Sequence, residues 1–156
     1  SEIMMHSQLK VFDGISSVEI HDTLIKSAAD LITADTPNYQ YVAARLLAYK
    51  LRKTAFGDFT PPTLLEHLQR QVKAGRYDKH LLEDYSEADI KKIGKLLVHE
   101  RDFDFAYSGM KQLESKYLVQ DRVTGEIYEN PQFAYIGIAM GLYAYEPKSK
   151  RVGFIK

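Results

Sequence analysis

The chain contains no cysteine, and its 21 basic residues are matched by 21 acidic ones. Without cysteine it has no disulfide framework, no thiolate metal site and no thiol nucleophile. The charge balance argues against a general nucleic-acid or membrane binder, because both classes usually carry a basic excess. No apolar run reaches the roughly 18 residues that a spanning helix needs, and the first residues lack the pattern of a signal peptide. We therefore expect no nucleic-acid and no membrane partner.

The rest of the composition is that of a folded, water-exposed domain. Hydrophobic residues make up 45% of the 156 positions and charged residues 27%, which is enough apolar surface for a compact core. The length suits one domain, or one domain with part of another. Internal repeats and low-complexity tracts are absent. The stiff connector from Phe59 to Pro62 is the best candidate for a boundary between two parts.

Apolar residues recur at helical spacing through most of the chain. Ser16 and Ser86, each followed three residues later by an acid, are typical of helix starts, and Thr60 or Thr63 is placed to cap another helix. We expect Asp35, Thr36 and Pro37 to end one helix and begin the next. The expected helices cover residues 3–12, 17–32, 37–56, 64–72, 87–97, 108–118 and 133–145, with a short helix or turn over 77–85 and an irregular basic tail over 148–156.

One segment departs from the helical period. Residues 117–129 place a Thr124-Gly125 turn between two short runs of residues that favour strands, which predicts a small β-hairpin. The predicted fold class is therefore mainly α, a helical domain with this single hairpin.

The common catalytic motifs are missing. Gly57, Gly75 and Gly94 are isolated, so there is no glycine-rich phosphate loop, and no histidine pair has metal-ligand spacing. His99 to Asp102 fits a charged helix end better than a catalytic loop. His67 and His80 are expected at the surface. Acidic pairs such as Glu83-Asp84 and Glu87-Asp89 fit helix starts, where acids favour the macrodipole. We expect no catalytic residue and no metal site.

A basic cluster is the most informative polar feature. Lys50 and Lys53 are three residues apart and share one helix face, while Ser17 and His21 are four apart near the start of another helix. Helix N-termini attract anions, and two lysines can hold a polyphosphate. The four residues would converge if the two helices pack side by side. From spacing alone, a solvated basic face explains the lysines better than an anion site.

Long stretches of the chain resemble the large (alpha) subunit of class I, aerobic ribonucleotide reductases. The resemblance runs from about Leu9 to Pro147. It is carried by residues 30–32 with 36–46, 77–85, 100–102 and, with the highest specificity, 111–129. It implies that residues 1–57 are the C-terminal part of an ATP-cone, that 58–147 are the N-terminal helical domain, and that 148–156 are a tail.

The resemblance also implies which functions belong to this part of the large subunit. Family positions that contact nucleotide fall on Ser17, His21, Lys50 and Lys53, in an incomplete allosteric site for ATP and dATP; Ser17 replaces a threonine and Lys50 a histidine of some relatives. The catalytic barrel and its cysteines are missing, so we expect no cofactor and no catalysis in this chain. The implied setting is cytoplasmic. The implied partners are the remainder of the large subunit, the small radical-generating subunit and a second copy of the chain.

A second hypothesis is a free-standing nucleotide-sensing or interaction module built from cone-like helices. A third is an unrelated helical adaptor that binds no nucleotide. The region after Thr60 and the hairpin favour the reductase, since a free-standing regulator has no need of them. Half a cone leaves apolar helix faces without their partners. Residues 1–56 are therefore expected to expose apolar surface, to pair with another chain, or to pack on residues 60–145, and to bind ATP or dATP weakly at most.

Overall fold

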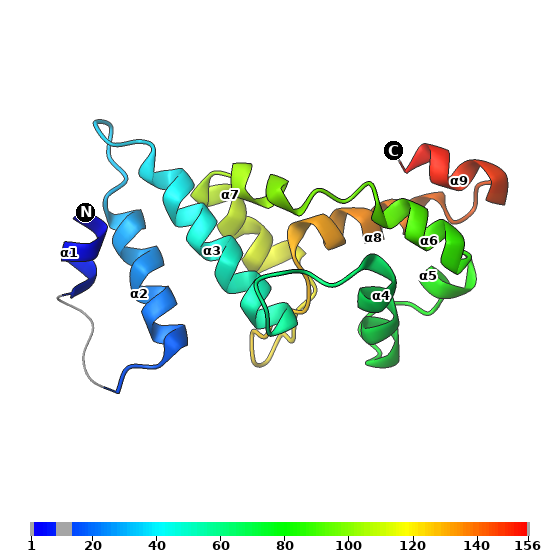
Figure 1. The fold of residues 1–156 in the computed structure, drawn as a ribbon, viewed down its shortest axis with the longest axis horizontal. Coiled ribbons are helices and arrows are strands. Elements are labelled where there is room, and N and C mark those ends of the chain that lie inside the picture. The colour runs from blue at the N-terminus through cyan, green and yellow to red at the C-terminus, as the bar shows by residue number, and fades with distance from the viewer. Residues whose placement is uncertain (1, 9–13, 156) are drawn as a thin grey trace.

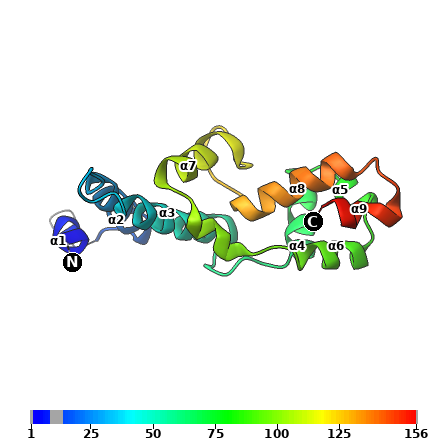
Figure 2. The ribbon, with the colours of Figure 1, turned by 90° about the horizontal axis from the view of Figure 1, so that it is seen from above.

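The computed structural model describes residues 2–8 and 14–155, which form an elongated, mainly helical chain (Figures 1 and 2). The predicted mainly α class is confirmed. Within the described ranges, no helix combines the length and apolarity needed to cross a membrane. The helices are α1 (Glu2–Gln8), α2 (Ser17–Asp30), α3 (Tyr39–Phe56), α4 (Leu64–Lys73), α5 (His80–Glu83), α6 (Glu87–Gly94), α7 (Tyr107–Gln112), α8 (Pro131–Tyr143) and α9 (Lys148–Phe154). A 3₁₀ segment, η1 (His99–Asp104), precedes α7, and a π-helical turn, η2 (Leu113–Tyr117), follows it.

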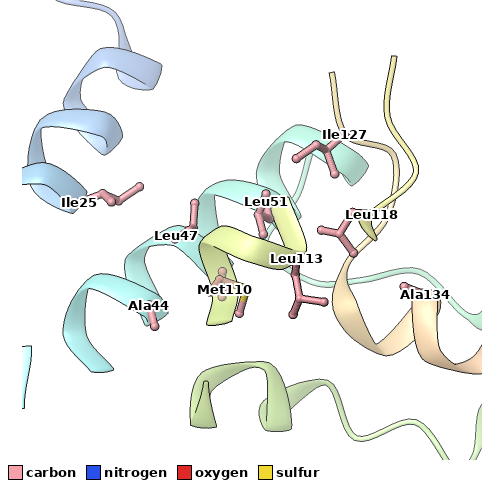
Figure 3. Close-up of a cluster of buried hydrophobic side chains, with 10 residues drawn as sticks. Ile25, Ala44, Leu47, Leu51, Met110, Leu113, Leu118, Ile127 and Ala134 are labelled. Atoms are coloured by element: carbon pink, nitrogen blue, oxygen red, sulfur yellow. The ribbon is translucent and has the colours of Figure 1, made fainter. Parts of the chain in front are cut away.

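A first core lies around α3 (Figure 3). Leu47 and Leu51 on α3 meet Ile25 of α2 on one side. On the other side they meet side chains that come after residue 57: Met110, Leu113, Leu118, Ile127 and Ala134. The helices before residue 57 therefore pack on the region that follows. They also leave apolar side chains exposed, including Met4, Met5 and Val18.

A second core gathers α4, α6, α8 and α9 at the other end of the molecule (Figures 1 and 2). Its buried members are Leu64, Leu68, Tyr85, Ile90, Ile93, Phe133, Ile136, Met140 and Ile155. Phe133 lies at its centre with no exposed surface, and Phe56 at the end of α3 contacts the Phe133 ring edge-on at 5.7 Å between centroids. This contact joins α3, the central helix of the first core, to the second core.

Capping side chains set where the helices begin. Ser16 forms a capping box with Glu19 at the start of α2, and Thr63 forms another with Glu66 at the start of α4. Thr63 Oγ1 accepts the Glu66 N–H at 3.3 Å, while Glu66 Oε2 accepts the Thr63 N–H at 2.9 Å. Each box satisfies two backbone donors that a helix end otherwise leaves open. The predicted starts at Ser16, Thr63 and Ser86 are confirmed.

Replacing the cap of α4 should cost measurable stability. Thr63→Ala removes the acceptor of the Glu66 N–H, so we expect the free energy of unfolding to fall by about 1 kcal/mol in urea denaturation. Thr54→Ala, an exposed position inside α3, is the matched control and should change it by less than about 0.5 kcal/mol. Equal losses of unfolding free energy in the two variants would show that the Thr63 cap does not stabilise the fold.

The predicted hairpin forms with minimal pairing. Gln120 and Ile127 make a single antiparallel bridge, flanked by hydrogen bonds from Asp121 N to Glu126 O at 2.9 Å and from Tyr128 N to Val119 O at 3.0 Å. Gly125 holds the turn with φ near +74°, a conformation that a side chain disfavours. The hairpin positions Ile127 in the first core.

Several predicted boundaries are wrong. The tail is not irregular: Lys148–Phe154 forms α9, whose Arg151 donates to the backbone carbonyl of Asp84. Residues 35–37 do not cap α3, because α2 ends at Asp30, Asn38 is the N-cap without a side-chain bond, and Thr36 Oγ1 donates to Leu31 O at 2.6 Å. The helix expected over 108–118 changes to a π turn after Gln112. The helix expected over 3–12 is α1, and residues 9–12 lie outside the described ranges.

Candidate functional site

The four residues predicted to hold nucleotide lie on α2 and α3, which pack side by side in opposite directions (Figure 1). Ser17 is the first residue of α2, and His21 is one turn further on. Lys53 lies in the last turn of α3, with Lys50 one turn earlier. Because the helices run antiparallel, the N-terminus of α2 and the C-terminus of α3 face the same end of the pair. The side-by-side packing on which the site prediction depended is therefore present.

Phe59, in the connector after α3, contacts two of these residues. Its ring centroid is 6.2 Å from that of His21 in an edge-on arrangement, and Lys53 Nζ lies 5.4 Å from it. Lys53 Nζ also donates to Gly57 O at 2.8 Å, which holds the lysine against the turn that leads to Phe59. The Tyr49 ring also contacts Phe59 edge-on, with the two centroids 5.9 Å apart. His21, Phe59 and Lys53 thus form one half-exposed cluster of a cation and aromatic rings.

Lys50 points into different surroundings. Its Nζ forms an ion pair with Asp22 Oδ1 at 2.5 Å. It lines a cavity of about 330 Å³ with Lys26, Tyr107 and Lys111 rather than the Phe59 cluster. The structure therefore brings His21 and Lys53 together but gives Lys50 an acidic partner on a neighbouring face of the helix pair.

Ser17 is exposed at the first turn of α2, where backbone N–H groups are free of intrahelical partners. The nearby capping box already uses one of these donors: Glu19 N–H bonds to Ser16 Oγ at 3.2 Å. The Ser16 backbone N–H, followed by its hydroxyl, lowers the pKa of Glu19, so that an acid stands beside the helix start. An anion at this end must therefore lie on the side of Ser17 and His21, away from Glu19.

His99 to Asp102 is not the charged helix end that was predicted, because Asp102 is fully buried. Asp102 Oδ2 accepts from Asn130 Nδ2 at 2.6 Å and lies 3.5 Å from an Arg52 guanidinium nitrogen. Arg52 is buried too and donates to the backbone carbonyl of His99. Burial raises the pKa of Asp102 to about 6, although Arg52 and its hydrogen-bond donors act in the opposite direction. This network ties α3, η1 and the start of α8 together.

His67 was predicted at the surface and is buried instead. Its ring stacks on Phe133 with centroids 4.0 Å apart, and Nε2 lies 3.1 Å from the Tyr77 hydroxyl. Tyr77 in turn donates to the Glu129 carboxylate, so His67 Nε2–H is the donor in its own contact. Burial, followed by the electrostatic interactions with Arg70 and His99, lowers the pKa of His67 to about 3. His67 is therefore a neutral core residue.

A buried neutral histidine predicts a pH dependence with a defined sign. The pKa of His67 is lower in the folded state than its ordinary 6.5, so the unfolded chain binds the proton more tightly. Stability should then fall as pH drops below about 6.5, by at most about 1.4 kcal/mol per pH unit. Asp102, whose pKa is raised, acts with the opposite sign between about pH 4 and 6.

We expect His67→Gln to flatten the decline in the free energy of unfolding between pH 6.5 and 4.5. The measurement is urea denaturation at several pH values. The exposed His80→Gln is the control and should keep the wild-type slope. An unchanged slope in His67→Gln would mean that His67 is protonated in the folded protein.

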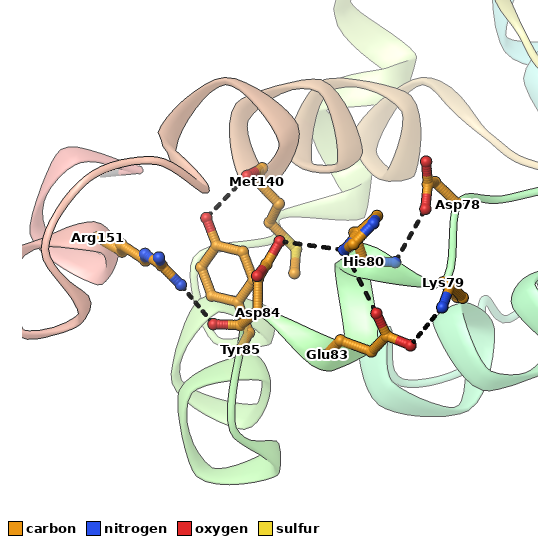
Figure 4. A network of polar contacts seen from close by, with 8 residues as sticks. All are labelled: Asp78, Lys79, His80, Glu83, Asp84, Tyr85, Met140 and Arg151. Atoms are coloured by element: carbon orange, nitrogen blue, oxygen red, sulfur yellow. Dashed lines mark hydrogen bonds and ion pairs between the residues drawn. The ribbon is translucent and has the colours of Figure 1, made fainter.

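The prediction that His80 lies at the surface is confirmed, and the acidic residues around α5 are structural (Figure 4). His80 Nδ1 lies 3.3 Å from Glu83 and 3.9 Å from Asp84, and Lys79 pairs with Glu83 at 3.1 Å. The Tyr85 hydroxyl donates to Met140 O at 2.8 Å, which fastens this segment to α8. Within the described ranges, no group of three or more His, Asp or Glu residues is arranged to hold a metal ion.

Comparison with known proteins extends these observations. No family model matches the chain. The chain is 51% identical over 156 residues to the ribonucleoside-diphosphate reductase 1 subunit alpha of Salmonella typhimurium and 49% identical to that of Escherichia coli. Each match covers the whole chain and 20% of the relative. The subunit alpha of enterobacteria phage T4 is 46% identical over 135 residues, which cover 86% of the chain and 18% of the relative.

The matches include the helices before residue 57, the connector and the hairpin region alike, because they span the chain from end to end. The chain spans about a fifth of the length of these curated relatives. The resemblance inferred from the sequence is confirmed: the chain belongs to the ribonucleoside-diphosphate reductase alpha-subunit family and corresponds to its N-terminal fifth.

Proposed function

We propose that this chain is the nucleotide-sensing and subunit-contacting part of a cytoplasmic ribonucleoside-diphosphate reductase large subunit. The intact enzyme reduces ribonucleotides to deoxyribonucleotides for DNA synthesis, and this part carries none of the chemistry. ATP and dATP are the proposed allosteric effectors of the intact protein. The relatives' names support the activity, and the lack of cysteine fits a part without redox chemistry.

The observation that carries the sensing proposal is the position of His21 and Lys53 against the ring of Phe59, beside the N-terminus of α2. An exposed aromatic ring offers a face or edge to a nucleobase. A lysine and free helix N–H groups suit a triphosphate. Ser17 and His21 would contact the phosphates and Lys53 would neutralise them. Lys50 contributes only if the nucleotide displaces Asp22.

The outer face of α8 supports the proposed contact with the remainder of the large subunit. One side of α8 is buried through Phe133, Ile136 and Met140, yet Ile138 is 60% exposed and Leu142 71% exposed on the other. A helix that is apolar all round is normally buried on all sides. The chain spans a fifth of the length of its relatives. We therefore propose that the rest of the large subunit packs against this exposed apolar face of α8.

The test is a chimaera in which this chain replaces the matching segment of the Salmonella typhimurium alpha subunit. We expect saturable binding of ATP and dATP at the cone in calorimetry. Lys53→Ala should weaken it about tenfold or more, because a charge-assisted phosphate contact is lost. Lys73→Ala, at an exposed position of α4 away from the cluster, is the control and should leave the affinity unchanged. Equal affinity in the two variants would reject Lys53 as a nucleotide ligand.

A further inference from the structure

A cavity of about 580 Å³ opens between the connector, α4 and α6, at the opposite end of the connector from the Phe59 cluster. Its walls are mainly apolar and are formed by Pro61, Pro62, Leu64, Leu65, Ile90 and Leu97. Small-molecule sites in proteins are typically apolar cavities of about 300–1,000 Å³ with a few placed polar groups. None of the four predicted nucleotide residues lines it, so it is separate from the proposed effector site.

The cavity walls are rigid. Two consecutive prolines restrict the connector, and the Thr63 capping box fixes where α4 begins. Gly94 allows α6 to approach α4 closely, since a Cβ at that position would lie 3.2 Å from Leu64 Cβ. Leu64 and Ile90 line the cavity and are at the same time packed in the second core. The cavity is therefore held open by the packing around it.

Two lysines give the cavity a positive rim. Lys91 and Lys95 are four residues apart, on one face at the end of α6, and both line the cavity. Lys91 lies 3.8 Å from Glu87, and the two side chains are 65% and 68% exposed, so the pair contributes little and yields readily to another anion. The lining contains no acidic residue.

His99 adds a neutral hydrogen-bond donor to the lining. Burial, followed by the charge of Arg52, lowers the pKa of His99. Its Nδ1 lies 3.0 Å from Asn130 Nδ2, and the orientation of that amide is fixed because its oxygen accepts the Phe133 N–H. Nδ1 must then be an acceptor, and the ring proton resides on Nε2. No partner of Nε2 is found in the described part of the chain.

From this geometry we propose that the cavity binds a small organic acid, with its apolar body against the proline and leucine walls and its carboxylate between Lys91 and Lys95. His99 Nε2–H supplies a further donor to a polar group within the cavity. The lining holds two lysines, which act as point charges, and no arginine fork, which suits a single carboxylate. The largely apolar walls also exclude a sugar-phosphate ligand, because the hydroxyl groups of its sugar would be left without hydrogen-bond partners.

The test is a titration of the 156-residue chain with decanoate, followed by the backbone amide NMR signals. We expect saturable shifts centred on Thr63, Gly94 and Lys95 at concentrations up to roughly 10 mM. Decanol, which lacks the charge, should bind at least about tenfold more weakly, as should decanoate to the Lys91→Gln, Lys95→Gln double variant. Lys92→Gln is the matched control, since Lys92 neighbours Lys91 on α6 but lies outside the lining and should leave binding unchanged.

Three results would overturn the proposal. The first is an absence of saturable shifts at the cavity on addition of decanoate. Shifts centred on Ile138 and Leu142 would show association with the apolar face of α8 alone. Equal binding of decanoate to the double variant and to Lys92→Gln would remove the role of the lysine rim. Both variants change only exposed side chains and leave the buried walls of the cavity intact. The amide spectra of the variants also report whether the chain remains folded.

Discussion

Asp102→Ala should lower the free energy of unfolding by about 3–5 kcal/mol at pH 7.5, where this carboxyl is ionised. Asp102 has no exposed surface, and its removal leaves the equally buried Arg52 guanidinium without a counter-charge. The variant also removes the carboxylate that accepts a hydrogen bond from Asn130 Nδ2. The side-chain oxygen of Asn130 caps the start of α8. The measurement is urea denaturation followed by circular dichroism.

Two further variants sharpen this test. Asp104→Ala, two residues away and exposed, is the matched control and should change stability by less than about 0.5 kcal/mol. Adding Arg52→Met to Asp102→Ala should recover part of the loss, because the unpaired buried charge is then gone. A loss of under about 1 kcal/mol in Asp102→Ala would contradict the account of a buried ion pair joining α3, η1 and α8.

Phe133→Ala should cost about 3–5 kcal/mol, the usual loss when a fully buried phenylalanine is truncated. Its ring stacks on His67 with planes 7° apart and takes edge contacts from Phe56 at 5.7 Å and His99 at 5.0 Å. These partners come from α3, α4 and η1, so the cavity left behind would weaken the contact between the two cores. Denaturant unfolding of the purified variant measures the effect.

Tyr135→Ala provides the comparison on the same helix. Tyr135 is two residues further along α8 and 48% exposed, and its truncation should cost less than about 1 kcal/mol in this chain. If Phe133→Ala proved as mild as Tyr135→Ala, Phe133 would not be the centre of the second core. Reduced cooperativity, seen as a smaller denaturant slope, would instead show the two cores separating.

The sequence predicted the helices well where their determinants are local. Ser16, Thr63 and Ser86 are caps because a side-chain oxygen and a backbone N–H three residues on are enough to begin a helix. The hairpin was predicted from Thr124-Gly125 for the same reason, since a glycine with positive φ defines its turn. The α9 helix was missed because it lacks a side-chain cap and depends on packing against α6 and α8.

Buried polar residues could not be predicted, because their partners are distant in sequence. Asp102 is 50 residues from Arg52, and Glu129 is 52 residues from Tyr77. His67 shares the buried face of α4 with Leu64 and Leu68, but it was predicted at the surface because histidine is seldom fully buried. Periodicity records which residues share a face, but it does not record which face another segment will cover.

The candidate site was predicted in part. The antiparallel packing of α2 and α3 brings His21 and Lys53 to one end, whereas the sequence made this convergence conditional on side-by-side packing of the two helices. The contacts of Phe59 with His21 and Lys53 were not predicted. The sequence indicates only a stiff connector there, because an aromatic residue in a loop belongs to no periodic pattern. The Asp22 partner of Lys50 lies 28 residues away and was equally invisible.

The most direct test of the central claim is the reductase activity of the Salmonella typhimurium alpha-subunit chimaera, assayed with its small subunit and a ribonucleoside diphosphate. We predict that the chimaera is active with ATP and inhibited by dATP, and that Lys53→Ala raises the dATP concentration for half inhibition about tenfold or more. A chimaera that is active but indifferent to dATP would contradict the proposal that this chain senses nucleotide for the enzyme.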